Sequence, residues 1–151
     1  MTARLLDFAE LPQLVGQALG TSEWMLVDQA RIDAFAQATG DHQWIHVDVA
    51  RAAQGPFGTT VAHGYLTLSL LPAMAASAFT VGASRMGVNY GLNRVRFPAP
   101  VPAGSRLRAH FGLASCEAVE GGLQLTIDAS IECEGSAKPV CVAQMLARRY
   151  A

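Results

Sequence analysis

The sequence predicts a single α+β domain, with helices in the first half of the chain and antiparallel strands in the second. Three observations predict this class: apolar residues recur at helical spacing up to about residue 80, they alternate with polar residues beyond residue 105, and one uncharged helix lies between the two patterns. Helices that precede a run of strands are typical of α+β architectures. The length of 151 residues suits one domain, so residues 1–151 are expected to form one unit.

The first 40 residues are expected to form two helices with a short strand between them. Apolar residues at helical spacing over residues 8–19 predict the first helix, and Glu23–Val27 is expected to be the strand. Asp28 is a good N-cap for the second helix, and Gly40 is a suitable residue to end it. A polar loop and a short helical turn near Asp48 are expected to follow.

The third predicted helix, at about Gly64–Phe79, is apolar nearly all round and lies in a segment, residues 52–84, without Asp, Glu, Lys or Arg. A transmembrane helix needs about 20 predominantly apolar residues. The apolar stretch here is shorter, contains Pro72 and follows a glycine-rich loop. We therefore expect a buried helix in a globular protein and no association with a membrane.

The second half is expected to form four consecutive antiparallel strands. The first spans Val88–Phe97, the second begins at Leu107, and the third spans Leu123–Cys133, where apolar and polar residues alternate. A hairpin turn at residues 120–122 joins the second and third strands. Val140–Leu146 is nearly all apolar and predicts a strand covered on both faces. The simplest packing places the uncharged helix against the concave face of a twisted sheet.

The composition is rich in apolar residues and poor in charge. Hydrophobic residues make up 51% of the chain and charged residues 15%, with a net charge of -1, whereas a typical charged share is about 25%. A chain with so little net charge has no strong attraction to nucleic acid or to anionic membranes. Because the buried helix accounts for only part of the apolar excess, we expect a homodimer in which two sheets join edge to edge.

The cysteines and the N-terminal residues indicate the cellular compartment in which the protein is expected. Cys116, Cys133 and Cys141 are odd in number, far apart and without a C-x-x-C pair, which argues against disulfides and against a zinc site. The first residues do not have the pattern of a signal peptide. These observations predict a cytoplasmic protein.

The polar segment from Gly40 to His46 holds the densest cluster of reactive side chains in the sequence. A carboxylate and an imidazole are the usual general acid/base pair. On one α-helix Asp41 and His46 would point about 140° apart, so they can act together only if the chain turns, and Gly40 supplies a reason for the helix to end just before them. The alternative is a solvated loop in which Asp41 forms an Asx-turn.

The uncharged helix begins with a glycine in the segment Val61–Tyr65. A helix N-terminus presents free N–H groups and a partial positive charge, and Gly64 allows a ligand to approach the backbone closely. Together these features predict an oxyanion hole. The alternatives are that Gly64 only starts the helix where the sheet crowds it, and that His63 is structural and not a second base.

Two motifs at this spacing resemble those of the MaoC-like dehydratases. They are DHQWIHVD at residues 41–48 and TVAHGYLTLSLLP at residues 60–72, and residues 88–105 are also similar to the nodulation-protein-N-like branch of that family. The resemblance covers roughly residues 27–150. It implies a hotdog fold, in which an antiparallel sheet wraps around a central helix. It also implies R-specific hydration of trans-2-enoyl-CoA to (R)-3-hydroxyacyl-CoA, with Asp41 and His46 as catalytic residues, Gly64 in the oxyanion hole, no metal, and no cofactor beyond the coenzyme A of the substrate.

The sequence departs from the family pattern at two places. Gln43-Trp44 stands where better-characterised hydratases have Asn-Pro, which bears on substrate range, and Pro72 stands where some of them have a serine, so no catalytic serine is assigned. Four side chains next to the predicted chemistry are expected to contact the acyl chain, although at least half of them can be ordinary core residues: Trp44, Ile45, Tyr65 and Leu66. The candidates for binding coenzyme A phosphates are Arg85, Arg94, Arg96, Arg106 and Arg108, each of which could equally lie on a solvated strand face.

In the expected mechanism, neutral His46 takes a proton from the attacking water, and Asp41 orients that water and relays a proton to C2. Both groups act on one face of the alkene, which predicts syn addition. One rival is a hotdog thioesterase, in which a carboxylate-activated water attacks the thioester carbonyl. The other is a non-catalytic acyl-binding subunit. The D-x4-H spacing argues against the first rival, and the intact set of Asp41, His46 and Gly64 argues against the second.

Overall fold

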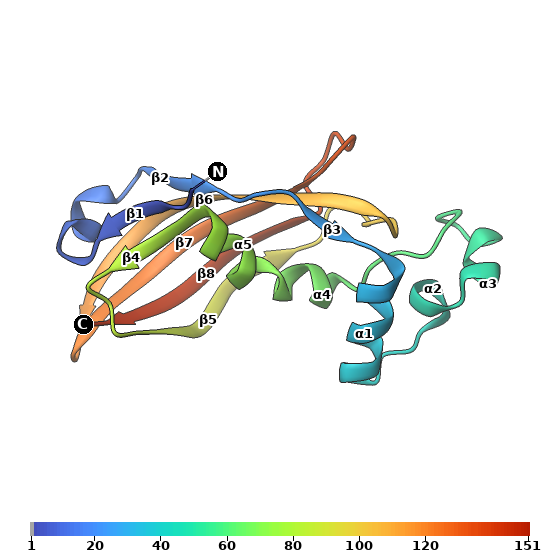
Figure 1. The fold of residues 1–151 in the computed structure, drawn as a ribbon, viewed down its shortest axis with the longest axis horizontal. Coiled ribbons are helices and arrows are strands. Elements are labelled where there is room, and N and C mark those ends of the chain that lie inside the picture. Colours follow the sequence, from blue (N-terminus) through green and yellow to red (C-terminus); the bar gives the residue numbers. More distant parts are fainter. Residues whose placement is uncertain (1) are drawn as a thin grey trace.

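The computed structural model describes residues 2–151, which form a curved antiparallel sheet with two short helices in line across its concave face (Figure 1). The main sheet has six strands in the order β2–β6–β7–β8–β5, and β3 also pairs with β6. The strands are β1 (Arg4–Asp7), β2 (Ala18–Thr21), β3 (Met25–Val27), β4 (Phe79–Gly82), β5 (Met86–Arg96), β6 (Ser105–Val119), β7 (Gly122–Cys133) and β8 (Cys141–Tyr150). The helices are η1 (Phe8–Leu14), α1 (Gln29–Thr39), α2 (Trp44–Val47), α3 (Val49–Ala53), α4 (Gly64–Ser69) and α5 (Leu71–Ala78). The expected hotdog arrangement is confirmed.

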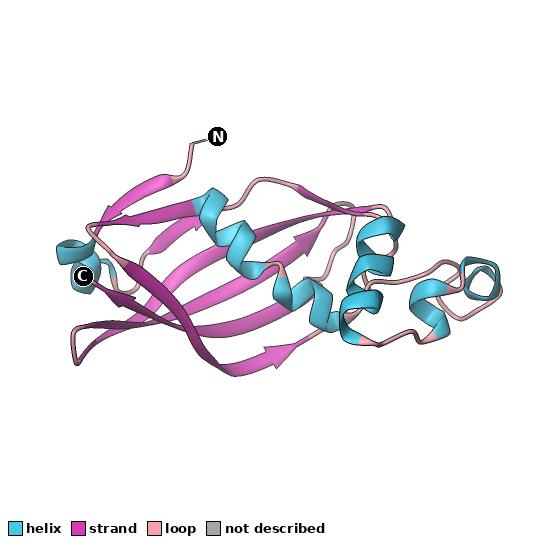
Figure 2. Ribbon diagram, turned by 60° about the horizontal axis from the view of Figure 1, so that its bottom comes forward, coloured by secondary structure: helices cyan, strands magenta, loops and turns pink. Residues whose placement is uncertain are grey.

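The long strands β6 and β7 follow the alternation seen in the sequence. Every second residue of β6 from Leu107 to Leu113, and of β7 from Leu125 to Cys133, is buried. Because neighbouring residues of a strand point to opposite faces, this pattern covers one face of the sheet with apolar side chains. Helix α5 packs on that face against β6 and β2, and α4 packs against β8 (Figure 2).

The central helix is divided, which corrects the prediction of one helix over Gly64–Phe79. Helices α4 and α5 meet at Leu70, and Pro72 lies in the first turn of α5. Proline has no N–H to bond to the carbonyl four residues earlier, and its ring crowds that carbonyl, so a continuous helix is interrupted here. Phe79 begins β4 and does not belong to the helix. Among the described residues, no helix is both long enough and apolar enough to cross a membrane.

The N-terminal prediction of a helix over residues 8–19 is wrong in its second half. Only residues 8–14 are helical, as the 3-10 helix η1, and β2 begins at Ala18 and pairs with β6. Gly16 has a φ of 84°, a left-handed conformation that turns the chain between the two elements. Leu11 and Leu19 are both fully buried, each from a different element. A parallel pair of β1 with β4, which the sequence did not predict, lies beside them.

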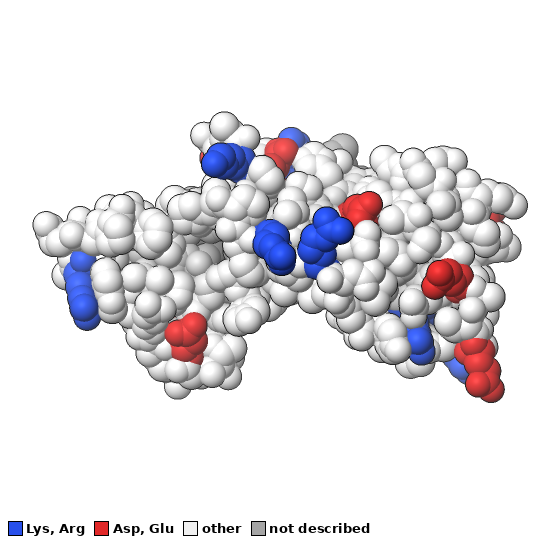
Figure 3. Space-filling model, turned by 180° about the vertical axis from the view of Figure 1, so that it is seen from behind, with Lys and Arg blue, Asp and Glu red and all other residues white. Residues whose placement is uncertain are grey.

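Strand β5 is an edge strand whose side chains are nearly all exposed. It pairs with β8 on one side only, and its other edge has no neighbour among the described residues. Four of its large apolar side chains are between 39% and 54% exposed: Met86, Val88, Tyr90 and Leu92. Seen from behind, charged side chains are few and scattered over a mostly uncharged surface (Figure 3). A long apolar edge of this kind is a pairing surface for another strand.

On strands β6 and β7, Glu132 joins two basic side chains. Its carboxylate accepts a hydrogen bond from Arg108 Nη2 at 2.6 Å and lies 2.7 Å from His110 Nε2. The hydrogen bond with His110, followed by the contact with Arg108, holds the pKa of Glu132 below its ordinary value near 4.5. A carboxylate with a lowered pKa in the folded state stabilises the fold above its unfolded pKa, and this contribution is lost as the pH falls through the folded value.

Replacement of Glu132 by glutamine is therefore expected to lower the melting temperature slightly at pH 7, and the difference from the parent protein should disappear as the pH falls below about 4.5. The group is more than a third exposed, so the loss should stay below about 1 kcal/mol. Thermal unfolding at pH 7, 5, 4 and 3 measures it. Glu134→Gln, which removes a more exposed pair with Arg106, is the control and should have a smaller effect. A Glu132→Gln difference that grows in acid would contradict the assignment.

Candidate active site

The predicted catalytic residues lie at the end of the sheet where β5 finishes and β8 begins. Helices α1, α2 and α3 gather beyond this end, and α4 points its N-terminus toward them (Figure 1). Residue 41 follows α1, residue 46 lies in α2, and residues 63 and 64 begin α4. Three segments that are separate in the sequence therefore meet at one place.

The turn that brings Asp41 and His46 together is built as the sequence predicted. Asp28 caps α1 by accepting a hydrogen bond from the Arg31 N–H at 2.9 Å. Gly40 ends the helix with a φ of 81°, and its N–H donates to the Ala36 carbonyl at 2.8 Å. The chain then reverses before α2 begins at residue 44. This left-handed glycine is the reason that the two residues are not held on diverging faces of one helix.

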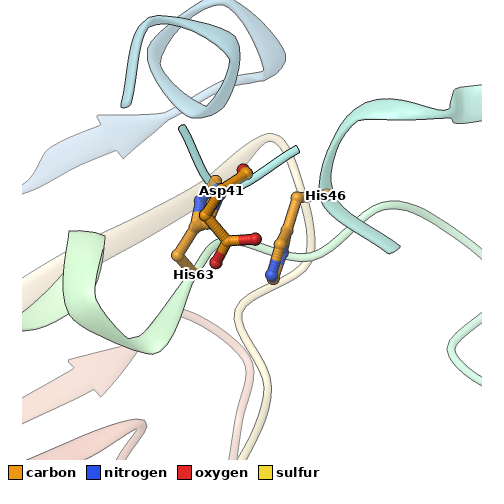
Figure 4. A group of neighbouring side chains, drawn as sticks. All are labelled: Asp41, His46 and His63. Atoms are coloured by element: carbon orange, nitrogen blue, oxygen red, sulfur yellow. The ribbon is translucent and has the colours of Figure 1, made fainter. Parts of the chain in front are cut away.

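The carboxylate of Asp41 comes close to two imidazoles (Figure 4). One carboxylate oxygen of Asp41 and one ring nitrogen each of His46 and His63 all lie within 4.8 Å of one another. Asp41 is exposed, whereas His46 and His63 are 7% and 2% exposed. The side chain of Asp41 also accepts a hydrogen bond from the Gln43 N–H at 3.3 Å. The Asx-turn of Asp41 is therefore compatible with its proximity to His46, although the sequence offered the turn and the acid/base pair as alternatives.

A backbone carbonyl fixes the state of the His46 ring. Nδ1 of His46 lies 2.6 Å from the carbonyl oxygen of Val61. Because a carbonyl only accepts, Nδ1 carries the hydrogen, and in the neutral ring Nε2 keeps its lone pair. The backbone of His46 is held as well, since Gln29 Nε2 donates to its carbonyl at 2.8 Å. His46 is therefore arranged to accept a proton at Nε2.

His63 packs directly against this pair. Its ring stacks on that of His46, with centroids 3.8 Å apart and planes inclined by 24°. Its Nε2 donates to the backbone carbonyl of Asp41 at 2.9 Å, while its Nδ1 is buried without a hydrogen-bond partner. The His63 side chain thus contacts both the ring of His46 and the backbone of Asp41.

The stacked rings are poorly arranged to bind a metal ion. Histidine binds a metal through a ring nitrogen, whose lone pair lies in the plane of the ring. Two nearly parallel rings 3.8 Å apart cannot both direct a lone pair at one ion. The arrangement of Asp41, His46 and His63 suits proton transfer better than chelation.

A cavity of about 380 Å³ adjoins the site. His46, Ile45 and Gly64 line it together with Phe97 and the segment 98–101. The Phe97 ring lies against Gly64, where an added Cβ would be 2.9 Å from Cδ2 of that ring. A Cβ here would have to displace the Phe97 ring, so crowding favours glycine, in line with one of the alternatives drawn from the sequence. As the first residue of α4, Gly64 also has an N–H without an acceptor in its own helix, so the oxyanion hole stays a prediction.

The other residues expected to contact substrate are dispersed. Of the four, Ile45 lines the cavity. Leu66 is buried in the core, and Tyr65 is 72% exposed with its ring edge on Phe97. Trp44 lies outside the lining of this cavity and has the Arg51 guanidinium 4.3 Å above its ring.

The candidate arginines for coenzyme A differ in how far they are engaged. Arg106 and Arg108 form ion pairs with Glu134 and Glu132, and both lie over the ring of Trp24. They are the least suited to bind phosphate. Arg96, which is next to Phe97, donates to the carbonyl of its neighbour Val95.

Several contributors to the site could not be expected from the sequence. The Val61 carbonyl, 15 residues after His46, accepts a hydrogen bond from the His46 ring. The Gln29 amide, 17 residues before His46, donates to the His46 backbone carbonyl. Thr60 in turn donates to the side-chain oxygen of Gln29. A glutamine in the first turn of a helix gives no sequence signal of such a role.

Comparisons with known proteins point to one family. The model of the family described as "MaoC like domain" matches residues 10–132. The chain is 51% identical over 144 residues to 3-hydroxyacyl-thioester dehydratase Z of Mycobacterium tuberculosis, covering 95% of each chain. It is 47% identical to nodulation protein N of Rhizobium leguminosarum bv. viciae, covering 93% of this chain and 89% of that one. The (R)-hydratase from A. caviae involved in PHA biosynthesis has a similar fold, with a TM-score of 0.71, 21% identity and coverage of 88% and 94%.

Proposed function

The chain belongs to the MaoC-like domain family and is a hydro-lyase of that type, and from this premise we propose that it adds water to trans-2-enoyl-CoA with R stereochemistry. The relatives named above include a 3-hydroxyacyl-thioester dehydratase and an (R)-hydratase. Hydration and dehydration are two directions of one reaction, so both names support the same chemistry. No cofactor takes part in the proposed reaction, since coenzyme A belongs to the substrate.

The observation that supports this function best is the convergence of the Asp41 carboxylate with His46, beside a cavity that Gly64 also lines. In the proposed reaction the water oxygen bonds to C3, and His46 Nε2 takes a proton from that water. Asp41 orients the water and relays the proton from the His46 imidazolium to C2, so both side chains return to their starting protonation states. The net result is addition of H and OH to the same face of the alkene.

Two backbone groups are proposed to contact the charges that develop during the reaction. They are the Val61 carbonyl beside the imidazolium and the Gly64 N–H beside the enolate oxygen. The imidazolium formed at His46 keeps its Nδ1–H donated to the Val61 carbonyl, so this contact persists through the proton transfer. The enolate oxygen of the thioester is proposed to accept a hydrogen bond from the Gly64 N–H. Loss of one such donor typically costs about 2.7–4 kcal/mol of transition-state stabilisation.

Incubation of the purified protein with crotonyl-CoA tests the proposal. The enoyl absorbance should fall without release of free thiol, and chiral analysis should identify (R)-3-hydroxybutyryl-CoA. Release of thiol would indicate the rival thioesterase. Tight binding of acyl-CoA of every chain length without turnover would indicate an acyl-binding subunit.

We also propose that the enzyme is a homodimer joined through the free edge of β5. The exposed apolar side chains of this strand and its unpaired backbone groups support that interface. A cytoplasmic location is part of the same proposal, because the three cysteines are free thiols.

Replacement of Tyr90 by lysine is expected to shift the protein from twice 16.0 kDa to 16.0 kDa, because a charge would have to be buried between the two β5 strands. Sedimentation velocity at micromolar concentration measures this. Leu26→Lys is the matched control, since Leu26 is an equally exposed apolar residue on β3. A parent protein that sediments as a monomer would refute the dimer.

A further inference from the structure

A second cavity lies at the end of the sheet opposite the catalytic pair. It has a volume of about 420 Å³ and lies between α5 and the concave face of the sheet. Its position follows from the pairing of Gly87 at the start of β5 with Arg149 near the end of β8, close to the chain end marked C in Figure 1. The main apolar lining residues are Pro72, Ala75, Phe79, Phe111, Ile127 and Met145.

Arg149 lines this cavity without a charged partner. The residue is partly buried, its Nε is buried without a hydrogen-bond acceptor, and its side chain forms no ion pair with any residue from 2 to 151. Burial lowers the pKa of Arg149. Withdrawing a charge from water is unfavourable unless an opposite charge compensates it. The other polar side chains in the lining, Thr80 and Asn89, are uncharged.

The position of the Arg149 guanidinium depends on residue 87 being glycine, which has no side chain. A Cβ at residue 87 would collide with Nη1 of Arg149. Gly87 therefore leaves the space beside the β5 backbone that the Arg149 guanidinium occupies. The site is built by two residues that face each other across paired strands, and the neighbouring Arg148 takes no part, because it stacks on Tyr90 and bonds to Gln124.

The cavity continues toward the catalytic end. It shares Pro72, Asn89 and Met145 with an adjoining hollow of about 310 Å³ that Leu68 and Ser69 of α4 also line. Gly64 and Thr67, one turn earlier, line the cavity beside His46. A row of cavities, with a cation in the one farthest from His46, thus follows the central helices.

We propose that Arg149 and this cavity bind the carboxylate end of an aliphatic chain. A guanidinium forms a bidentate pair with one carboxylate, which would neutralise the single charge, while the apolar lining covers the chain. Two sources supply this chemistry: a free fatty acid, or the terminal carboxyl of an acyl thioester that carries one at its far end. The second source rests on the function proposed above, and the first does not.

Calorimetric titration with dodecanoate and with dodecanol tests the site without requiring activity. The parent protein should bind the acid at least about tenfold more tightly than the alcohol, as a charge-assisted pair predicts. Arg149→Met should abolish this preference, and Gly87→Ala should weaken it by displacing the guanidinium. Arg148→Met, the matched control, should keep it. Equal binding of acid and alcohol by the parent, or an unchanged preference in Arg149→Met, would overturn the proposal.

A kinetic comparison separates the two sources. If the carboxyl belongs to the substrate, a trans-2-enoyl-CoA with a terminal carboxyl should have a higher kcat/KM than the unsubstituted thioester of equal length, and Arg149→Met should remove that advantage. If only free acid binds, the two thioesters should react alike in both proteins. Inactivity toward every thioester would refute the proposed function and leave the calorimetric result to decide on the site.

Thermal unfolding of Arg149→Met distinguishes a ligand site from a contact between subunits. Removal of a partly buried charge that has no partner among residues 2–151 should leave the melting temperature unchanged or raise it. A lower melting temperature, together with dissociation into monomers, would show that a second copy supplies the missing anion, and would overturn the proposal.

Discussion

Asp41→Asn and His46→Gln are each expected to lower kcat for crotonyl-CoA hydration by about 10²–10⁴-fold, the usual contribution of a general acid or base. Both substitutions preserve the local structure. Asparagine can still accept the Gln43 N–H that holds the Asp41 side chain, and glutamine keeps a polar amide of about the length of the His46 ring without its basic nitrogen. A loss of rate would therefore report on proton transfer and not on the loop.

Two neighbouring variants serve as controls. Asp48→Asn changes another carboxylate of the same segment, which caps α3 by accepting the Arg51 N–H, a role that asparagine can also fill. His42→Gln changes an exposed histidine next to Asp41. Both should keep kcat within a few-fold of the parent. If Asp41→Asn or His46→Gln also kept near-parental kcat, the role given to that residue would be wrong.

His63→Leu is expected to lower kcat by about 10²-fold, the size of effect that a small misplacement of catalytic groups produces. Leucine can neither donate to the Asp41 carbonyl nor stack on the His46 ring, so both residues proposed for catalysis lose a contact that orients them. The cavity next to Gly64 does not include His63 in its lining, and KM should change much less than kcat.

His63→Gln provides the discriminating comparison. Glutamine can restore the N–H donor to the Asp41 carbonyl but not the ring stack, so it should recover part of the lost kcat. Far-UV circular dichroism and melting temperature establish that both variants fold. If both variants kept parental kcat, or if KM rose while kcat stayed constant, a positioning role for His63 would be refuted.

Local signals in the sequence predicted the elements that local forces determine. Asp28 and Gly40 bound α1 as expected, because caps act within one turn of the helix end. The alternation of β7 was reliable, since one face of that strand is buried and the other is not. The helix expected over residues 8–19 failed because burial against the sheet places Leu11 and Leu19 in different elements, and periodicity alone does not show this.

The site was predictable in its members but not in its geometry. Gly40 gave a reason for the chain to turn after α1, and the resemblance of the D-x4-H motif to the MaoC-like family led to the expectation that Asp41 and His46 act together. The state of the His46 ring depends on the Val61 carbonyl, and the packing of His63 depends on where α4 begins relative to α2. These relations arise from tertiary packing, as does the unpaired Arg149, which in the sequence is one of two adjacent arginines in a strand.

The order of strands in the sheet has a consequence for synthesis of the protein. Strand β5 pairs only with β8, which the ribosome makes after β6 and β7. A nascent chain therefore carries an apolar strand with two open edges throughout the production of the central hairpin, the kind of surface that leads to aggregation. The yield of folded protein in a cell is therefore expected to depend on how long β5 stays uncovered on the ribosome, which strand order determines and the residues proposed for catalysis do not.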